Sequence, residues 1–310
     1  MSAAEFHRQD VRFRSGDASC AAWLYRPEGA AKPPLVILGH GLGATREMRL
    51  DAYCAEFAAA GIAALAFTYR HFGDSGGQPR QLLSIRRQLE DWEAAIAHAK
   101  SRSDINVERI AIWGSSFGGG HVLTLAARHP ELLAAVAQCP FTDGVASARA
   151  VGPSAAMRTL PRAVADGLGS LAGREPVRIP VAAKPGAVGL MSASDALPGY
   201  MALVPDPASF RNEVAARISL RLPFYRPGRS AGDVRIPILF CVSKSDTVAP
   251  AAPTLRYAQD APLGRIRTYE AGHFDFYLGK AFRRIVADQR DFLVTNLVVA
   301  PRPSGSKGES

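Results

Sequence analysis

The sequence contains few of the residues that mark disulfide-rich or metal-binding proteins. Only four of its 310 residues are cysteines, at positions 20, 54, 139 and 241, and none belongs to a Cys-x-x-Cys pair. Each lies among apolar neighbours, which is typical of small buried thiols in a reducing compartment. We therefore expect reduced cysteines and no metal site.

Long apolar runs are also missing. No uninterrupted stretch approaches the roughly 18 residues that a membrane-spanning helix needs. The segment from Met1 to Asp10 is polar and lacks the apolar core of a secretory signal. These absences predict a cytoplasmic protein with no membrane partner.

The chain also lacks a concentrated patch of one charge. Its 37 Lys and Arg residues against 28 Asp and Glu give a net charge of +9, but the arginines are spread along the chain. No basic run alternates with aromatic residues, so we expect a solvated basic surface and no nucleic-acid partner. An anionic substrate such as an acyl-CoA stays an alternative. We expect a small-molecule substrate and no organic cofactor, and a homo-oligomer is left open.

What the chain does contain is a regular alternation of short apolar runs with helical patterns. The sequence predicts strands at 11–14, 20–25, 35–38, 62–68, 109–113, 134–138, 237–242 and 266–269. Helices are predicted at 48–60, 84–100, 253–259 and 282–297, and another ends near residue 129. This order indicates an α/β fold. We expect a mostly parallel, doubly wound sheet with helices on both faces and the first two strands as an antiparallel hairpin at its edge.

The segment 144–232 interrupts the alternation. It is rich in Ala, Pro, Gly and Ser, and a structureless loop of that length is unusual in a compact domain. We therefore expect a partly helical cap inserted into a core made of residues 1–143 and 233–300. The composition of residues 301–310 predicts a disordered tail.

The strongest chemical signal is Gly114-Ser115-Ser116-Phe117-Gly118, which fits Gly-x-Ser-x-Gly. A predicted strand precedes it and a helical segment follows, which is the context that places a serine on a sharp strand-to-helix turn. The flanking glycines allow close backbone approach, and the helix N-terminus favours developing negative charge. We expect Ser116 to be a nucleophile.

A serine hydroxyl needs a base, and the base needs an acid to orient it. His273 follows the last predicted strand, and Asp246 follows the strand before it. The chain order serine, acid, histidine is that of this architecture. His40 and His71 are rival bases because both follow strands, although they precede Ser116. Asp143 is the rival acid.

Two backbone N–H groups are expected to hold the oxyanion. One is that of Phe117, directly after the nucleophile, and the other is that of Leu42 in the glycine-rich loop after the first parallel strand. The neighbouring Gly41 or Gly43 is the alternative for the second. We expect His40 to order this loop through hydrogen bonds.

These motifs together resemble the α/β-hydrolase superfamily. The resemblance covers about residues 34–274 and rests on five pieces: Gly39 to Gly43, Tyr69 to Gly77, Gly114 to Gly118, Ser245 to Pro250, and Gly272 to Phe274. Within the superfamily the chain is similar to dienelactone-hydrolase-like and X-Pro-peptidase-like serine hydrolases. Residues 190–200 and 225–227 are similar to the polyketide acyltransferase group. A serine at 116 argues against dehalogenases and epoxide hydrolases, which use aspartate there.

The resulting hypothesis is a carboxylic ester hydrolase that forms an acyl-enzyme on Ser116. The alternatives are an acyltransferase that delivers the acyl group to a different acceptor, a peptidase or thioesterase of the same fold, and a non-catalytic binding protein. The sequence does not separate the first two, because the difference depends on whether the cap excludes water.

Overall fold

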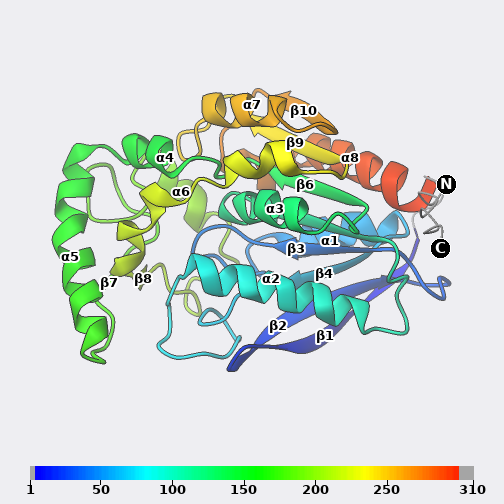
Figure 1. Cartoon of the computed structure of the whole chain (residues 1–310), viewed down its shortest axis with the longest axis horizontal. Helices are drawn as coiled ribbons and strands as arrows, with labels where there is room; N and C mark the ends of the chain where they lie inside the picture. Colours follow the sequence, from blue (N-terminus) through cyan, green and yellow to red (C-terminus); the bar gives the residue numbers. More distant parts are fainter. Residues whose placement is uncertain (1–3, 300–310) are drawn as a thin grey trace, which may run out of the picture.

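A mixed sheet forms the centre of the molecule in the computed structural model, which describes residues 4–299 (Figure 1). Its strands are β1 (Phe6–Ser15), β2 (Ala18–Pro27), β3 (Leu35–Gly39), β4 (Ala63–Phe67), β5 (Ile110–Ser115), β6 (Ala134–Gln138), β9 (Ile238–Ser243) and β10 (Gly264–Tyr269). They lie in the order β1-β2-β4-β3-β5-β6-β9-β10. The pairs from β4 to β10 are parallel, and β1-β2 and β2-β4 are antiparallel. The predicted fold class is confirmed.

Helices cover both faces of the sheet. Helices α2 (Ile85–Lys100), α3 (Phe117–Arg128) and α7 (Ala251–Gln259) lie on one face, and α1 (Leu50–Ala59) and α8 (Gly279–Val294) lie on the other (Figure 1). This arrangement buries every residue of β3, β4, β5, β6 and β9. Burial on both sides explains why these strands appear in the sequence as continuous apolar runs instead of alternating ones.

Local signals account for where several elements begin. The clearest is the start of α2, where the Ser84 hydroxyl accepts a hydrogen bond from the Arg87 N–H and so satisfies a free donor of the first turn. The predicted apolar face of α2 is buried through Trp92 and Ile96. The hairpin β1-β2 is longer than predicted and turns at Gly16, whose φ of 56° suits glycine.

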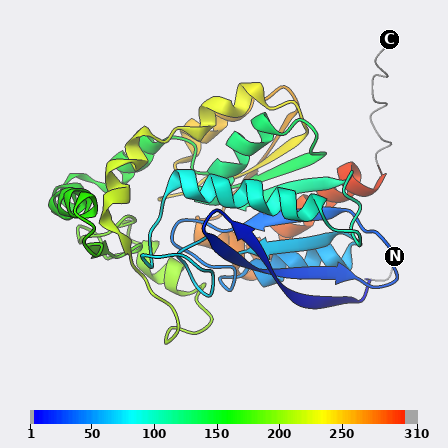
Figure 2. The same cartoon turned by 60° about the horizontal axis from the view of Figure 1, so that its bottom comes forward.

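Most of the segment 144–232, called the insert below, lies at one end of the molecule, beyond the ends of the parallel strands, whereas its last turn packs against α3 and α7 (Figures 1 and 2). It contains α4 (Gly144–Val151), α5 (Pro153–Leu171), α6 (Ala196–Met201) and the 3₁₀ turns η1 (Ala216–Leu220), η2 (Leu222–Phe224) and η3 (Pro227–Asp233). A short antiparallel pair, β7 (Arg178–Ile179) and β8 (Val214–Ala215), completes it. Its predicted partly helical character is confirmed.

Three expectations concern other parts of the chain. The tail 301–310, expected to be disordered, lies outside the described residues. Among residues 4–299, no helix has the length and apolar character needed to cross a lipid bilayer. All four cysteines are buried and free, as predicted.

Candidate active site

Ser116 occupies a tight turn between β5 and α3. Its backbone has φ 55° and ψ −116°, a positive φ that residues with a side chain rarely adopt. A β-carbon on Gly114 would lie 2.3 Å from the Gly118 carbonyl oxygen, and one on Gly118 would lie 2.6 Å from the His40 carbonyl oxygen. The two glycines of the motif are therefore required by backbone packing around a strained serine.

The structure brings Ser116, His273 and Asp246 together. The His273 Nε2 lies 3.1 Å from the Ser116 Oγ, and its Nδ1 lies 2.7 Å from the Asp246 Oδ2. The side chains of His273 and Asp246 are only 3% and 1% exposed. The other carboxylate oxygen of Asp246 accepts the N–H groups of Val248 and Ala249, which fixes its orientation.

The three side chains come from loops at one edge of the sheet. Ser116 directly follows β5, Asp246 follows β9, and His273 follows β10. Parallel strands end at the same edge, so residues 130 positions apart in sequence meet there. The serine hydroxyl can donate to His273, and the other ring nitrogen can donate to the carboxylate. This arrangement can remove the proton of the serine hydroxyl as its oxygen attacks a substrate.

The two rival histidines lie in other networks. The His40 ring accepts from the Tyr69 N–H at 3.4 Å and contacts the Gly41 carbonyl at 3.0 Å, so it orders the loop after β3. Burial lowers the pKa of His40 to about 3, which keeps it neutral. The His71 Nδ1 lies 3.0 Å from the Pro79 carbonyl, away from the serine.

The rival acid Asp143 has a structural environment of its own. Its carboxylate caps the N-terminus of α4 and forms an ion pair with Arg226 at 2.9 Å. The Tyr257 hydroxyl donates to the same carboxylate at 3.0 Å. Burial opposes its charge, yet these donors hold the pKa of Asp143 below its ordinary value. No hydrogen bond joins it to His273 among the described residues.

The loop after β3 passes directly over the serine. A β-carbon on Gly41 would lie 3.1 Å from the Ser116 Cβ and 3.5 Å from its Oγ. Within residues 4–299, the backbone N–H groups of Leu42 and Phe117 have no hydrogen-bond acceptor. Phe117 is the first residue of α3, where an N–H lacks an intrahelical partner. The two predicted donors therefore lack an acceptor, and their residues line the same cavity as Ser116.

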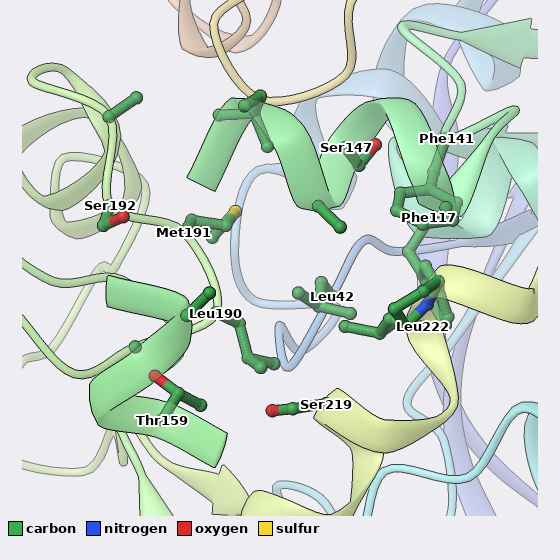
Figure 3. A pocket seen from close by; sticks show the side chains of 18 of the residues that line it. Leu42, Phe117, Phe141, Ser147, Thr159, Leu190, Met191, Ser192, Ser219 and Leu222 are labelled. Carbon is green, nitrogen blue, oxygen red and sulfur yellow. The ribbon is translucent and has the colours of Figure 1, made fainter. Parts of the chain in front are cut away.

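An apolar cavity of about 350 Å³ has Ser116 in its lining. Figure 3 shows this cavity with Leu42 and Phe117 among the residues around it. Its lining comes from the core and from the insert and includes Leu42, Phe117, Phe141, Met157, Leu160, Leu190, Met191, Leu222 and Val248. The sequence pattern does not single out the insert residues of this lining, such as Leu190 and Leu222. Short 3₁₀ turns and loops carry such residues without any periodic signal.

Three side chains at the site carry atoms of the kind that bind metal ions. Donor atoms of Cys139, Asp246 and His273 lie within 4.8 Å of one another. Burial raises the pKa of the Cys139 thiol well above its ordinary value, and a metal requires the thiolate. The direct bond between His273 and Asp246 also occupies both of their facing atoms. The donor set therefore suits a proton relay better than a metal.

Comparisons with known proteins agree with this geometry. The family described as serine aminopeptidase, S33, matches residues 30–274. The chain belongs to this family of α/β hydrolases. AidA of Acinetobacter baumannii (strain MDR-ZJ06), a quorum-quenching protein, is 50% identical over 284 residues, which are 92% of this chain and 93% of AidA.

Two fungal proteins are more distant relatives. The polyketide transferase grgF of Penicillium sp. is 29% identical over 64% of this chain and 66% of its own length. The crystal structure of GrgF superposes with a TM-score of 0.81 at 24% identity, covering 94% and 99% of the two chains. A thiohydrolase of Eupenicillium brefeldianum is 28% identical over 58% of this chain and 56% of its own. The expected similarity to the polyketide acyltransferase group is confirmed.

Proposed function

We propose that this protein is a serine hydrolase that cleaves a carboxylic ester or a related acyl bond through an acyl-enzyme on Ser116. The observation that carries the proposal is the hydrogen-bonded series from Ser116 through His273 to Asp246, next to an apolar cavity. A hydroxyl that donates to a buried imidazole, itself held by a carboxylate, is the arrangement that activates a serine.

In the proposed reaction, the Ser116 oxygen attacks the acyl carbon while His273 takes the hydroxyl proton at Nε2. Asp246 stabilises the imidazolium and keeps the ring in its orientation. The imidazolium gives the proton to the departing alcohol, which leaves an ester between the acyl group and Ser116. Water then attacks this ester with His273 again as base, releasing the acid and restoring the serine.

The tetrahedral intermediate places negative charge on the former carbonyl oxygen. We assign its two donors to the free backbone N–H groups of Leu42 and Phe117. The N-terminus of α3 adds its dipole at the same point. Donors that are fixed before the reaction cost no reorganisation, so each one is expected to contribute about 10²-fold or more to the rate.

The insert acts as a cap in this proposal, over a core formed by residues 1–143 and 233–300. The cavity lining predicts an acyl group that is mainly apolar. The quorum-quenching function named for AidA makes a bacterial signal molecule a candidate natural substrate. The thiohydrolase relative adds thioesters to the bonds worth testing.

The test is a comparison of the parent enzyme with Ser116→Ala on p-nitrophenyl esters, lactones and thioesters of graded acyl length. The parent should turn over at least one series, and the variant should lose this activity while its circular dichroism spectrum stays unchanged. Full turnover by Ser116→Ala would end the proposal. If the parent enzyme turns over none of these ester, lactone and thioester series, the proposed hydrolase activity is wrong.

Acyl transfer is the second candidate, supported by the similarity to a polyketide transferase. It shares every step up to the acyl-enzyme, after which an alcohol, amine or thiol replaces water. Product analysis in the presence of a competing acceptor separates the two. A transferase would give mainly the transferred ester, amide or thioester, whereas a hydrolase would give mainly the free acid.

A further inference from the structure

Helix α6 of the insert packs against two of the loops that carry the proposed catalytic residues. Asp195, at its N-terminus, accepts a hydrogen bond from the hydroxyl of Thr247 at 2.6 Å, and Thr247 is the residue after the proposed acid. A β-carbon on Gly199 would lie 2.3 Å from a ring carbon of Phe274, the residue after the proposed base. These contacts fix the helix beside the catalytic side chains.

Tyr200 of the same helix reaches a third loop, the one after β3. Its hydroxyl donates to the Leu42 carbonyl at 3.0 Å. Burial raises the pKa of Tyr200 well above its ordinary value, so the hydroxyl keeps the proton that it donates. No backbone N–H within residues 4–299 donates to this carbonyl. The insert therefore supplies a hydrogen bond that the backbone of the loop does not supply itself.

The loop has little conformational preference of its own at this point. Leu42 lies between Gly41 and Gly43, and the φ of Gly43 is 63°, in a region that glycine adopts without strain. The His40 ring contacts the Gly41 carbonyl at 3.0 Å, and this carbonyl shares its peptide unit with the Leu42 N–H. The Tyr200 hydroxyl holds the next peptide unit along the chain. One side chain from the core and one from the insert thus fix the two peptide units that meet at Leu42.

The insert also limits how far this loop can move. A β-carbon on Gly43 would lie 2.5 Å from a side-chain carbon of Val181 and 3.3 Å from one of Val214. Val181 follows β7 and Val214 begins β8, so both valines belong to the insert. The backbone of the loop after β3 therefore lies against the insert at a second point, next to the one that Tyr200 holds.

We propose that Tyr200 is a positioning residue that holds the Leu42 N–H in place for the oxyanion. Tyr200 lines a small cavity of about 20 Å³ together with Ser116 and His273, which places the tyrosine at the site itself. Donors stabilise an oxyanion most when they are fixed before the reaction begins. The insert then contributes to catalysis besides covering the acyl group. This role rests on the proposed function, because it requires an oxyanion to form at Ser116.

The test removes the Tyr200 hydroxyl alone. Tyr200→Phe keeps the ring that packs on Phe210 and Phe274, and it removes the hydrogen bond to Leu42. The Leu42 N–H stays present but is held less firmly, so kcat on a p-nitrophenyl ester should fall roughly 10-fold, less than the about 10²-fold cost of losing a donor. KM should stay close to the parental value, because Tyr200 is not part of the lining of the large apolar cavity.

The matched control is Tyr225→Phe. The insert contains two tyrosines, and the Tyr225 hydroxyl also joins the insert to the core, through His121 of α3 at 2.7 Å. Its bond does not involve the loop after β3. Tyr225→Phe should keep the parental kcat. If the Tyr200 hydroxyl only attaches the insert to the core, both variants should lower the urea midpoint alike and neither should lower kcat.

Binding of a transition-state analogue gives a second readout. With an alkyl trifluoromethyl ketone, the Ser116 oxygen adds to the ketone carbon, the hydroxyl proton moves to His273, and the carbonyl oxygen becomes an oxyanion. The alcohol obtained by reducing the same ketone forms no such adduct. Tyr200→Phe should raise the Ki of the ketone by roughly the factor by which kcat falls and should leave the Ki of the alcohol unchanged.

Three results would overturn this role. They are a parental kcat and ketone Ki in Tyr200→Phe, an equal loss of kcat in Tyr225→Phe, and an equal rise in the Ki of ketone and alcohol. In each case the parent enzyme still hydrolyses esters, so the proposed function stands. A parent that hydrolyses none of the substrates refutes the proposed function and the role of Tyr200 together.

Discussion

A β-carbon on residue 41 would lie only 3.1 Å from the Ser116 Cβ, so Gly41 gives the serine side chain space that a larger residue would take by pushing it a few tenths of an ångström. Gly41→Ala should therefore shift either the Ser116 hydroxyl or the loop that carries the Leu42 N–H. A displacement of about 1 Å at reacting atoms can cost about 10²-fold in rate, so we expect a smaller loss in kcat/KM, of roughly several-fold, from a shift of this size. The measurement is steady-state ester hydrolysis.

The matched control for Gly41→Ala is Gly232→Ala. A β-carbon there would meet nothing closer than 3.8 Å, and its backbone does not have a positive φ. The control should keep parental kinetics. Equal kinetics of both variants would show that the loop is not held against the serine as described.

Asp246 and Asp143 both follow strands, but we predict opposite consequences for their replacement. Asp246→Asn removes the charge that faces the His273 Nδ1, and kcat should fall by about 10³- to 10⁴-fold with little change in stability. Asp143→Ala removes the cap of α4 and should lower the free energy of unfolding by about 1–2 kcal/mol.

The two measurements are pre-steady-state or steady-state hydrolysis and urea denaturation. At urea concentrations and temperatures at which Asp143→Ala is folded, its kcat should be close to that of the parent. A large loss of kcat in Asp143→Ala without unfolding would instead favour Asp143 as the acid.

Buried neutral histidines should make the fold sensitive to acid. Burial lowers the pKa of His121 to about 3, below the ordinary value of 6.5 that it regains on unfolding. Between these values the unfolded chain binds the extra proton, so stability is full above pH 6.5 and is lost as the pH falls towards 3. The slope is about 1.4 kcal/mol per pH unit for each such group.

His121→Gln removes one of these groups while keeping a polar side chain beside Gln88 and Tyr225. The free energy of unfolding, measured by urea titration from pH 7 to pH 4, should fall less steeply in the variant. An unchanged slope would mean that His121 is not buried in its neutral form.

The cavity beside Ser116 should set the preferred acyl length. Ser147 lines it from α4 (Figure 3), and Ser147→Phe would fill part of its volume. We expect the optimum among p-nitrophenyl esters to move to shorter chains. Ser170→Phe, on α5 and outside the cavity lining, is the control and should leave the optimum unchanged.

Much of the core followed from local sequence patterns. The strand 134–138 was predicted to the residue, because four buried apolar residues followed by Gln138 lie between clear turn signals. Helix α7 begins at Ala251, two residues before the prediction, since Pro253 is tolerated within a first turn that needs no N–H there. Helix α8 begins at Gly279 instead of 282 and gives way to a π-helical turn at Thr295.

The insert was much less predictable. Helix α5 contains Pro161, and its large apolar residues are exposed while its buried side holds Ala, Thr and Asp, so its apolar face does not mark the buried one. The sequence could not decide between Asp246 and Asp143 as the acid. The decision depends on which of the two loops lies beside the His273 loop after β10, and only the structure shows that. The turn around Ser116 could be predicted from the sequence because its glycines are required by local contacts. These contacts are with backbone atoms within six residues and with one neighbouring loop.

The most direct test of the account is the site of covalent labelling by a fluorophosphonate. Peptide mapping by mass spectrometry after reaction should find the phosphonyl adduct on Ser116 of the parent protein, and Asp246→Asn should react far more slowly. An adduct on another serine, or none on a folded protein that hydrolyses esters, would contradict the assignment of Ser116 as the nucleophile.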